Sequence, residues 1–199
     1  MSKLVAFGDS ITYGYALDDN FNEDKPSVYA WPSLVAKELN LDVTNLGQPG
    51  ASNKEIWLNI LNYNVFDKDD IVIINWNTAQ RFCIIDEKDT KRIGLSTRFA
   101  DKKTTDIFYK HFYNDYDMWL DTNLRISHIQ SFLQTQTTVY HSFTSGPQFR
   151  LTSWNKDCII IGNSMFEYRE KDKALDGTHP GKNAHKWFAQ SLLQDIEVK

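Results

Sequence analysis

The order of apolar and polar positions along the chain predicts short buried strands separated by longer amphipathic helices. Leu4–Phe7 and Ile71–Ile74 are continuous apolar runs, which are typical of strands covered on both faces of a sheet. Leu41–Leu46 alternates like a strand with one apolar face. Two later runs, Thr137–Phe143 and Asp157–Ile161, bring the number of predicted strands to about five.

Four amphipathic stretches between or after these runs predict helices: Pro32–Leu39, a segment that begins after Ser52 or Asn53, 104–134 as one helix or two, and 182–196. Because strands and helices alternate, we predict an α/β protein, a three-layer α/β/α sandwich with a central parallel sheet of about five strands. It is expected to form one domain over residues 1–199. The irregular, charge-rich stretch 81–103 predicts a loop, lid or insertion.

Composition narrows the classes of function. The chain has 199 residues and a formal net charge of −4, which argues against a broad nucleic-acid-binding surface. No run approaches the ~18 apolar residues of a membrane span, and the apolar run near the N-terminus is too short for a secretory signal. We therefore expect a cytoplasmic protein with neither a nucleic-acid nor a membrane partner. Homo-oligomer formation is left open.

Aromatic residues, cysteines and histidines refine this picture. The chain has 12 Phe, 9 Tyr and 6 Trp, so some rings, including those of segment 104–134, are expected in a groove or at a subunit contact. Cys83 and Cys158 are expected to stay reduced. No spacing predicts a metal site, and no cofactor is expected. Four histidines lack partners at catalytic or metal spacing and are expected to be structural: His111, His128, His141 and His185.

Three segments that follow predicted strands carry candidate chemistry. Gly8-Asp9-Ser10 places a serine at the carboxyl edge of the sheet, where ligands bind, although a serine here can also simply cap a helix. Asp176 and His179 lie three residues apart in a turn, so a carboxylate–imidazole hydrogen bond can form, unless the histidine is an incidental surface residue. Gly47, in the loop 45–50, can present its backbone N–H to a ligand or can simply make a turn.

These segments together resemble the GDSL/SGNH hydrolase family: Gly-Asp-Ser-Ile-Thr at 8–12, Asn-Leu-Gly-Gln-Pro-Gly at 45–50 and Asp-Gly-Thr-His-Pro at 176–180. The resemblance implies the flavodoxin-like fold of that family and a serine esterase that needs no cofactor. It makes Ser10 the nucleophile, His179 the general base and then the general acid, and Asp176 its orienting partner. It also implies an oxyanion hole formed by the N–H of Ser10, the N–H of Gly47 and an asparagine side chain.

The asparagine is the point at which the sequence departs from the family pattern. The family usually has Gly-x-Asn-Asp after the third strand, whereas Asn75-Trp76-Asn77-Thr78 follows that strand here. Aligning Asn75 with the family glycine makes Asn77 the oxyanion residue, with Asn75 as the alternative. Thr78 then replaces the family's acid, and it cannot supply a carboxylate.

Substrate contacts are expected from Asp9, Trp76 and Arg81, although Trp76 can instead belong to the core and Arg81 can instead form a solvated ion pair. The expected substrate is a small-molecule or carbohydrate ester, since aromatic side chains near the motifs can stack on sugar faces. Two alternatives stay open. One is an acyltransferase with the same site, and the other is a non-catalytic carbohydrate-binding module, which the altered loop 75–78 motivates.

Overall fold

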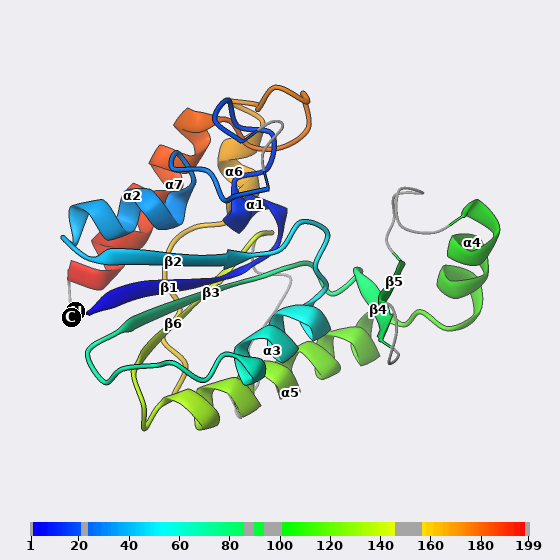
Figure 1. Ribbon diagram of the computed structural model, residues 1–199. Coiled ribbons are helices and arrows are strands. Elements are labelled where there is room, and N and C mark those ends of the chain that lie inside the picture. The colour runs from blue at the N-terminus through cyan, green and yellow to red at the C-terminus, as the bar shows by residue number, and fades with distance from the viewer. Residues whose placement is uncertain (1, 21–23, 86–89, 94–100, 146–156, 198–199) are drawn as a thin grey trace.

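A four-stranded parallel sheet in the order β2-β1-β3-β6 forms the centre of the molecule (Figure 1). The computed structural model describes the following residues: 2–20, 24–85, 90–93, 101–145 and 157–197. The strands of the sheet are β1 (Lys3–Gly8), β2 (Asp42–Gly47), β3 (Ile71–Trp76) and β6 (Thr138–Phe143). The predicted α/β class is confirmed. Since the strands are parallel, their carboxyl ends meet at one edge, where a site is expected.

The predicted fifth strand is reduced to a single bridge, so the described sheet has four strands rather than about five. Ile160 forms one parallel bridge with His141. The N–H of His141 donates to the carbonyl of Ile159, and the N–H of Ile161 donates to the carbonyl of His141. Gly162 then adopts a φ of 72°, which turns the chain out of the extended conformation. Pairing therefore stops after one residue.

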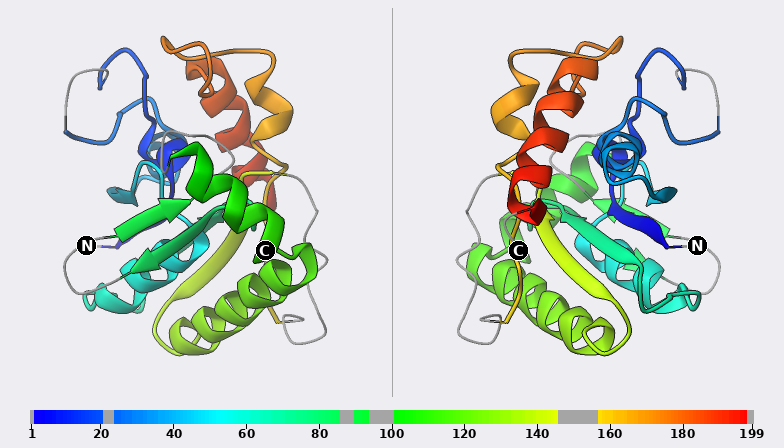
Figure 2. Two further views of the ribbon diagram at one scale, coloured as in Figure 1. Left: turned by 90° about the vertical axis from the view of Figure 1, so that its right-hand side faces the viewer. Right: turned by 90° about the vertical axis from the view of Figure 1, so that its left-hand side faces the viewer.

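Helices cover both faces of the sheet, as the sandwich prediction requires (Figures 1 and 2). One face carries α1 (Ser10–Tyr13), α2 (Trp31–Glu38), α6 (Phe166–Arg169) and α7 (Lys182–Glu197), and the other carries α3 (Asn53–Asn62) and α5 (Asp115–Leu133). Segment 104–134 divides between α4 (Lys102–His111) and α5, because Asn114 caps a new helix by accepting the N–H of Asp117. Within the described ranges, no helix is both long and apolar enough to cross a membrane.

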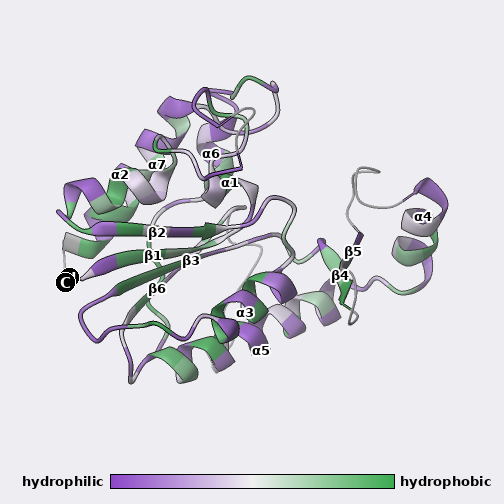
Figure 3. Ribbon diagram, in the orientation of Figure 1, coloured by the Kyte–Doolittle hydropathy of each residue, from purple (hydrophilic) through white to green (hydrophobic). Residues whose placement is uncertain are grey.

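Each face of the sheet has its own apolar core. Alternate residues of β3 point to opposite faces. Ile73 lies in one cluster with Trp31 of α2 and Phe188 of α7, whereas Ile74 lies in a second cluster with Ile60 of α3. All five side chains are fully buried. Figure 3 shows hydrophobic residues concentrated on the central strands. The sheet is thus a rigid base for the loops at its carboxyl edge.

The stretch 81–103, predicted as a loop, lid or insertion, contains a β-hairpin and the start of a helix. β4 (Phe82–Ile85) pairs antiparallel with β5 (Thr90–Ile93), and α4 follows (Figure 1). The remaining parts of the stretch, 86–89 and 94–100, lie outside the described residues. The hairpin lies beyond the carboxyl ends of β1 and β3 in Figure 1.

Part of the aromatic surplus packs α4 against this hairpin. Phe82 of β4 stacks on Phe108 of α4, with ring centroids 4.7 Å apart, and Tyr109 meets Phe108 edge to face. Phe112 and Tyr116 are largely exposed. The rings of segment 104–134 therefore divide between a local cluster and the surface, and no described ring contact joins them to the segment around Ser10.

Candidate active site

The candidate nucleophile lies directly after strand β1. A side chain at Gly8 would overlap that of Thr12, so a glycine lets α1 fold back over the end of the strand. Asp9 begins α1 by accepting the N–H of Ile11 on its Oδ1, at 2.9 Å. Ser10 is the first residue of α1 and is 6% exposed. It therefore lies at the carboxyl edge of the sheet, held by the residue before it.

Ser10, His179 and Asp176 lie in one line of hydrogen bonds. Nε2 of His179 is 3.1 Å from Oγ of Ser10, and Nδ1 is 2.6 Å from Oδ2 of Asp176. The serine and the histidine are 169 residues apart in the chain, so only the fold brings them together. This order of hydroxyl, imidazole and carboxylate is the arrangement that a Ser-His-Asp triad requires.

The turn that carries Asp176 and His179 is held by its own short-range hydrogen bonds. Oδ1 of Asp176 accepts the N–H of Thr178 and of His179, both at 2.9 Å, and Oδ2 accepts the hydroxyl of Thr178 at 2.8 Å. Burial alone would raise the pKa of Asp176, but these hydrogen bonds outweigh burial and hold the pKa well below its usual range. The charged carboxylate fixes the imidazole proton on Nδ1, which leaves Nε2 free to accept from Ser10.

A second contact joins this turn to the segment that follows the nucleophile. The N–H of Leu175 donates to the carbonyl of Ala16 at 3.1 Å. The ring of Tyr15 lies 5.1 Å from that of His179 and is tilted by 56°. Tyr15 is 44% exposed and Leu175 is 61% exposed. An aromatic and an aliphatic side chain therefore border the site on its solvent side.

Gly47 ends β2, but its N–H already has an acceptor. It donates to Oδ1 of Asn45 at 3.0 Å, and Nδ2 of Asn45 donates to the carbonyl of Thr12 at 2.7 Å. A side chain at position 47 would overlap the backbone of Tyr13. The glycine thus allows α1 to pack on β2, and its N–H is not open to an oxyanion in this arrangement.

Gly50, the second glycine of the same loop, was not among the predicted site residues. Its φ of 83° is left-handed, and its N–H has no hydrogen-bond acceptor within the described chain. The carbonyl of the next residue, Ala51, accepts from both Asn77 and Arg81, which also contact Asp9. The loop therefore lies against the nucleophile turn. A glycine in a turn, rather than at the end of a strand, is the signal that could have identified it.

Asn77 is fixed behind the nucleophile turn. Its backbone N–H donates to Oδ1 of Asn53 at 2.7 Å, and its carbonyl accepts from Nδ2 of Asn53 at 3.0 Å. Its own Nδ2 donates to Oδ2 of Asp9 at 2.6 Å and to the carbonyl of Ala51 at 3.1 Å. A primary amide has only two hydrogens to donate. Binding an oxyanion therefore requires that one of these two hydrogen bonds be released.

Asn75, the alternative oxyanion residue, is fully buried within strand β3. Neither its Nδ2 nor its Oδ1 has a hydrogen-bond partner among the described residues, and the same is true of the hydroxyl of Ser142, its neighbour across the β3–β6 pair. By the alternation of the strand, Asn75 shares the face of Ile73 rather than that of Ile74. Asn75 and Ser142 therefore form a buried polar pair on the same face of the sheet as Ile73.

The three predicted substrate contacts have other partners. Asp9 is 1% exposed, and Trp76 is fully buried with its Nε1 donating to Nδ1 of His141 at 3.0 Å. Neither side chain reaches the surface in this structure, so Trp76 takes the alternative place in the core and Asp9 is a buried partner of the nucleophile turn. Arg81 forms the ion pair that was the alternative, with its Nη1 3.1 Å from Oδ2 of Asp9. Its partner is a buried carboxylate rather than a solvated one.

Two of the remaining histidines are buried structural groups. Nδ1 of His141 accepts from Trp76, and its Nε2 lies 2.9 Å from Oε1 of Gln130. Nδ1 of His185 accepts the backbone N–H of Trp31 at 3.2 Å. Burial lowers the pKa of each ring to about 3. Both are therefore neutral at ordinary pH and serve as acceptors in the core.

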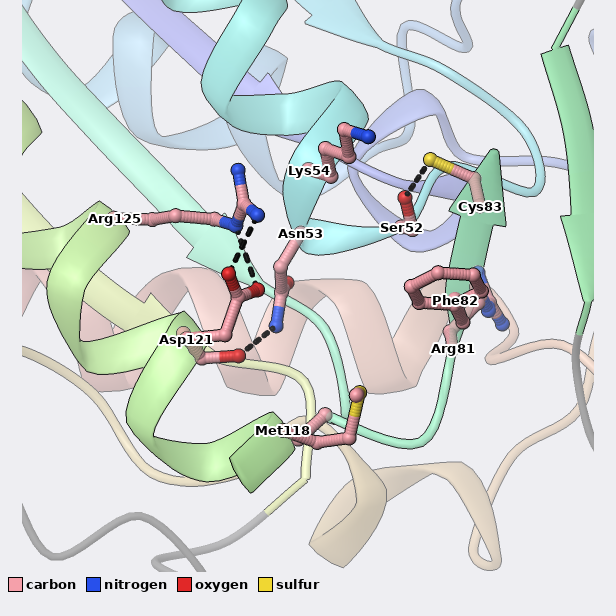
Figure 4. Close-up of a pocket in the computed structure, with 11 residues that line it drawn as sticks. Ser52, Asn53, Lys54, Arg81, Phe82, Cys83, Met118, Asp121 and Arg125 are labelled. Carbon is pink, nitrogen blue, oxygen red and sulfur yellow. Dashed lines mark hydrogen bonds and ion pairs between the residues drawn. The ribbon is translucent and has the colours of Figure 1, made fainter. Parts of the chain in front are cut away.

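A pocket lies beside Arg81 at the start of α3, between β4 and α5 (Figure 4). Arg125 on one side is bound to Asp121 by two hydrogen bonds of 2.8 and 2.7 Å. Cys83 on the other side has its Sγ 2.9 Å from Oγ of Ser52, and burial raises the pKa of its thiol. In the part of the chain that the structure describes, no group of three His, Cys, Asp or Glu residues could hold a metal ion.

Comparisons with known proteins bear on the fold. No family model and no curated protein matches the chain, but solved structures do. A member of the lipolytic G-D-S-L family from Veillonella parvula is 16% identical, with a TM-score of 0.56 over 98% of this chain and 97% of its own. An acetyl xylan esterase from Butyrivibrio proteoclasticus is 16% identical, with a TM-score of 0.59 over 99% of this chain and 63% of its own. The psychrotrophic esterase EstA from Pseudoalteromonas is 10% identical, with a TM-score of 0.57 over 100% and 98%. The chain thus has the fold of the GDSL/SGNH hydrolases.

Proposed function

We propose that the protein is a serine hydrolase that cleaves carboxylic esters of small or carbohydrate-borne acyl groups through an acyl-enzyme. One observation carries the proposal, the line of hydrogen bonds from Ser10 through His179 to Asp176. A serine hydroxyl is a weak nucleophile unless a neighbouring base takes its proton. The esterases among the similar solved structures support the same class of reaction.

The reaction proceeds in two halves. Nε2 of His179 takes the proton of Ser10 as Oγ attacks the ester carbonyl, and Asp176 stabilises the imidazolium that forms. The imidazolium then protonates the leaving alcohol, which leaves an acyl group on Oγ. Water, activated by the same imidazole, releases the acid. An alcohol in place of water would give acyl transfer, and product analysis with an added sugar acceptor separates the two reactions.

Three donors stabilise the tetrahedral oxyanion in this proposal. They are the N–H of Ser10, the N–H of Gly50 and Nδ2 of Asn77. Gly50 replaces Gly47, whose N–H donates to Asn45. Asn77 keeps its shorter hydrogen bond, 2.6 Å to Asp9, and exchanges the longer one, 3.1 Å to Ala51, for the oxyanion. A donor to the oxyanion contributes roughly 10²–10³ in rate when it is preorganised.

Two side chains at the rim support a carbohydrate-borne or other small ester. Tyr15 presents an exposed ring beside His179, and Leu175 is exposed next to the triad turn. Aromatic faces of this kind pack against the apolar faces of sugars. The proposed substrate therefore places its acyl group on Ser10 and its alcohol part against Tyr15.

Labelling with a serine-directed phosphonate tests the proposed function. Peptide mapping is expected to find the label on Ser10 of the wild-type protein and to find none in the His179→Ala variant, which lacks the base. The wild-type protein is also expected to hydrolyse p-nitrophenyl acetate. Absence of both labelling and turnover would contradict the proposal.

A second candidate function is a non-catalytic carbohydrate-binding module on this fold. It is favoured by the state of Asn77, both of whose amide hydrogens are already bonded to protein groups. A binding module would bind sugars with unchanged affinity in the Ser10→Ala variant and would show no ester turnover in the wild-type protein. Calorimetry with acetylated and deacetylated sugars, run beside the turnover assay, separates the two candidates.

A further inference from the structure

The carboxylate of Asp9 lies buried next to the candidate nucleophile with both oxygens occupied. Oδ1 accepts the N–H of Ile11, and Oδ2 accepts from Nδ2 of Asn77 at 2.6 Å and from Nη1 of Arg81 at 3.1 Å. Asp9 is 1% exposed. A carboxylate at such a place is costly unless a positive charge compensates it. Arg81 is the cation that supplies this charge.

Arg81 reaches Asp9 from a turn that the sequence places after β3. The N–H of Arg81 donates to the carbonyl of Thr78 at 3.3 Å, which closes the turn. Nη1 of Arg81 also lies 3.3 Å from the carbonyl of Ala51. In Figure 4 Arg81 lies with Phe82 at one side of the pocket, across from Arg125 and Asp121. The guanidinium therefore bridges the loop after β2 and the turn that begins α1.

We propose that Arg81 is a positioning residue for the nucleophile, which acts by compensating the buried charge of Asp9. With this compensation, Asp9 caps α1 and holds the amide of Asn77, so Ser10 and the proposed oxyanion donor keep a fixed relation to each other. This inference rests on the proposed function. Thr78 cannot supply the carboxylate that the family has at this position. The ion pair of Arg81, three residues later, with Asp9 instead fixes the segment that follows β3.

The structure provides a matched control on the hairpin that follows Arg81. Arg92 of β5 forms an ion pair with Glu55 at 2.8 Å. The two arginine side chains are 24% and 25% exposed, and the carboxylate partners are 1% and 6% exposed. Glu55 belongs to the capping box of α3 rather than to α1. Arg92→Gln thus breaks a comparable ion pair without touching the turn that carries Ser10.

The test compares kcat and KM for p-nitrophenyl acetate in Arg81→Gln and Arg92→Gln, with thermal unfolding of each variant. Misplacing a reacting group by about 1 Å can cost on the order of 10² in rate. Arg81→Gln is therefore expected to lower kcat about 10- to 100-fold and to change KM by less than about twofold, while Arg92→Gln keeps kcat within about twofold. Equal kcat losses in the two variants, or none in Arg81→Gln, would overturn the inference.

A double variant keeps the inference testable if Arg81→Gln alone does not fold. If Arg81 acts on the nucleophile through Asp9 rather than through Ala51, its replacement is expected to change kcat by less than about twofold when Asp9 is already replaced. The Asp9→Asn variant is compared with the Asp9→Asn, Arg81→Gln double variant. A further tenfold loss in the double variant would show that Arg81 acts in another way.

Hydrogen exchange separates this inference from the proposed function. The amide of Ile11 is expected to exchange faster in Arg81→Gln but not in Arg92→Gln, because only the first variant loosens the cap at Asp9. This readout does not depend on turnover. A wild-type protein without esterase activity contradicts the proposed function, whereas equal exchange at Ile11 in both variants contradicts the positioning role.

Discussion

Two loops at the carboxyl edge of the sheet, 176–179 and 75–78, differ in how their functional side chains are held. The first fixes its carboxylate and its imidazole through hydrogen bonds within four consecutive residues. The second fixes Asn77 through contacts with Asn53, Ala51 and Asp9, which come from other elements. In the proposed mechanism, the base is therefore already in place, whereas Asn77 must give up a hydrogen bond before it can bind an oxyanion. The segment that positions the nucleophile can therefore be in its working arrangement while Asn77 is still bound to other protein groups.

Removing the base from loop 176–179 is expected to have the largest effect. His179→Ala should lower kcat for p-nitrophenyl acetate by on the order of 10⁴, because among the described residues only His179 is hydrogen-bonded to the Ser10 hydroxyl. Thermal unfolding should change little, since the imidazole is partly exposed. Steady-state kinetics with a Ser10→Ala control measure the effect. Activity that survives in His179→Ala would show that loop 176–179 does not supply the base.

Changing the asparagine of loop 75–78 is expected to have the next largest effect. Asn77→Ala should lower kcat roughly 10²–10³-fold and leave KM nearly unchanged, because the donor binds only the transition state. Asn75→Ala is the matched control, since Asn75 is buried with no hydrogen-bond partner among the described residues. If Asn75→Ala shows the larger loss in kcat, the assignment of the oxyanion residue is wrong by two positions.

Acid should destabilise the folded protein through two buried histidines, His141 beside Trp76 and His185 beside Trp31. The pKa of His141, which accepts from Trp76, and that of His185 are lowered by burial to about 3. As the pH falls below about 6.5, the unfolded chain protonates these rings while the folded chain does not. The free energy of unfolding is therefore highest above about pH 6.5, and it falls by about 1.4 kcal/mol per pH unit for each ring as the pH drops towards 3.

The low pKa of Asp176 acts in the same direction but in a more acidic range. Its contribution to stability is present above the pKa that an aspartate has in the unfolded chain and is lost only as the pH falls through the lower folded value. Urea unfolding at pH 7, 6 and 5 measures how the free energy of unfolding changes with pH through the two histidines. Replacing His141 by Gln should remove about half of that change. A stability that is constant over this range would contradict the assignment of both rings as neutral acceptors.

The smallest expected effect is at the rim of the site. Tyr15→Ala should raise KM about two- to fivefold for an acetylated sugar and leave p-nitrophenyl acetate almost unaffected, because only the sugar uses the ring face. Tyr15→Phe should retain the wild-type KM, since it keeps the ring and removes only the hydroxyl. A loss of kcat for both substrates in Tyr15→Ala would indicate that the ring orients His179 instead.

The sequence predicted those parts of the site that depend on short-range contacts. Ser10 follows a strand-ending glycine, and Asp176 and His179 are joined within one turn, so their motifs contain the geometry. For Gly47 and Trp76 the structure favours the alternatives, a turn glycine and a core side chain. The acceptor of the Gly47 N–H is a side chain of the same strand, and Trp76 is the last residue of β3, on the same face as the buried Ile74. The alternation of that strand indicates that Trp76 is buried with Ile74, although its position next to the candidate asparagine favoured a place in the site.

The fold was predictable to a similar extent and for similar reasons. Continuous apolar runs identified β1 and β3, whose faces are both covered. The run 157–161 contains enough apolar residues for a strand, but Gly162 ends its pairing with β6 after one bridge. The division between α4 and α5 depends on the cap at Asn114, which hydrophobic periodicity does not register. Local polar chemistry, more than the apolar pattern, therefore sets where elements begin and end.

The distance along the chain between the two halves of the site has a kinetic consequence. Ser10 and His179 are 169 residues apart, and Trp31 and His185, which join α2 to α7, are 154 apart. Contacts between such distant residues form late and slowly, because a long loop must close before they give any stabilisation. If the proposed esterase activity is present, its return during refolding should coincide with docking of α7 on the sheet.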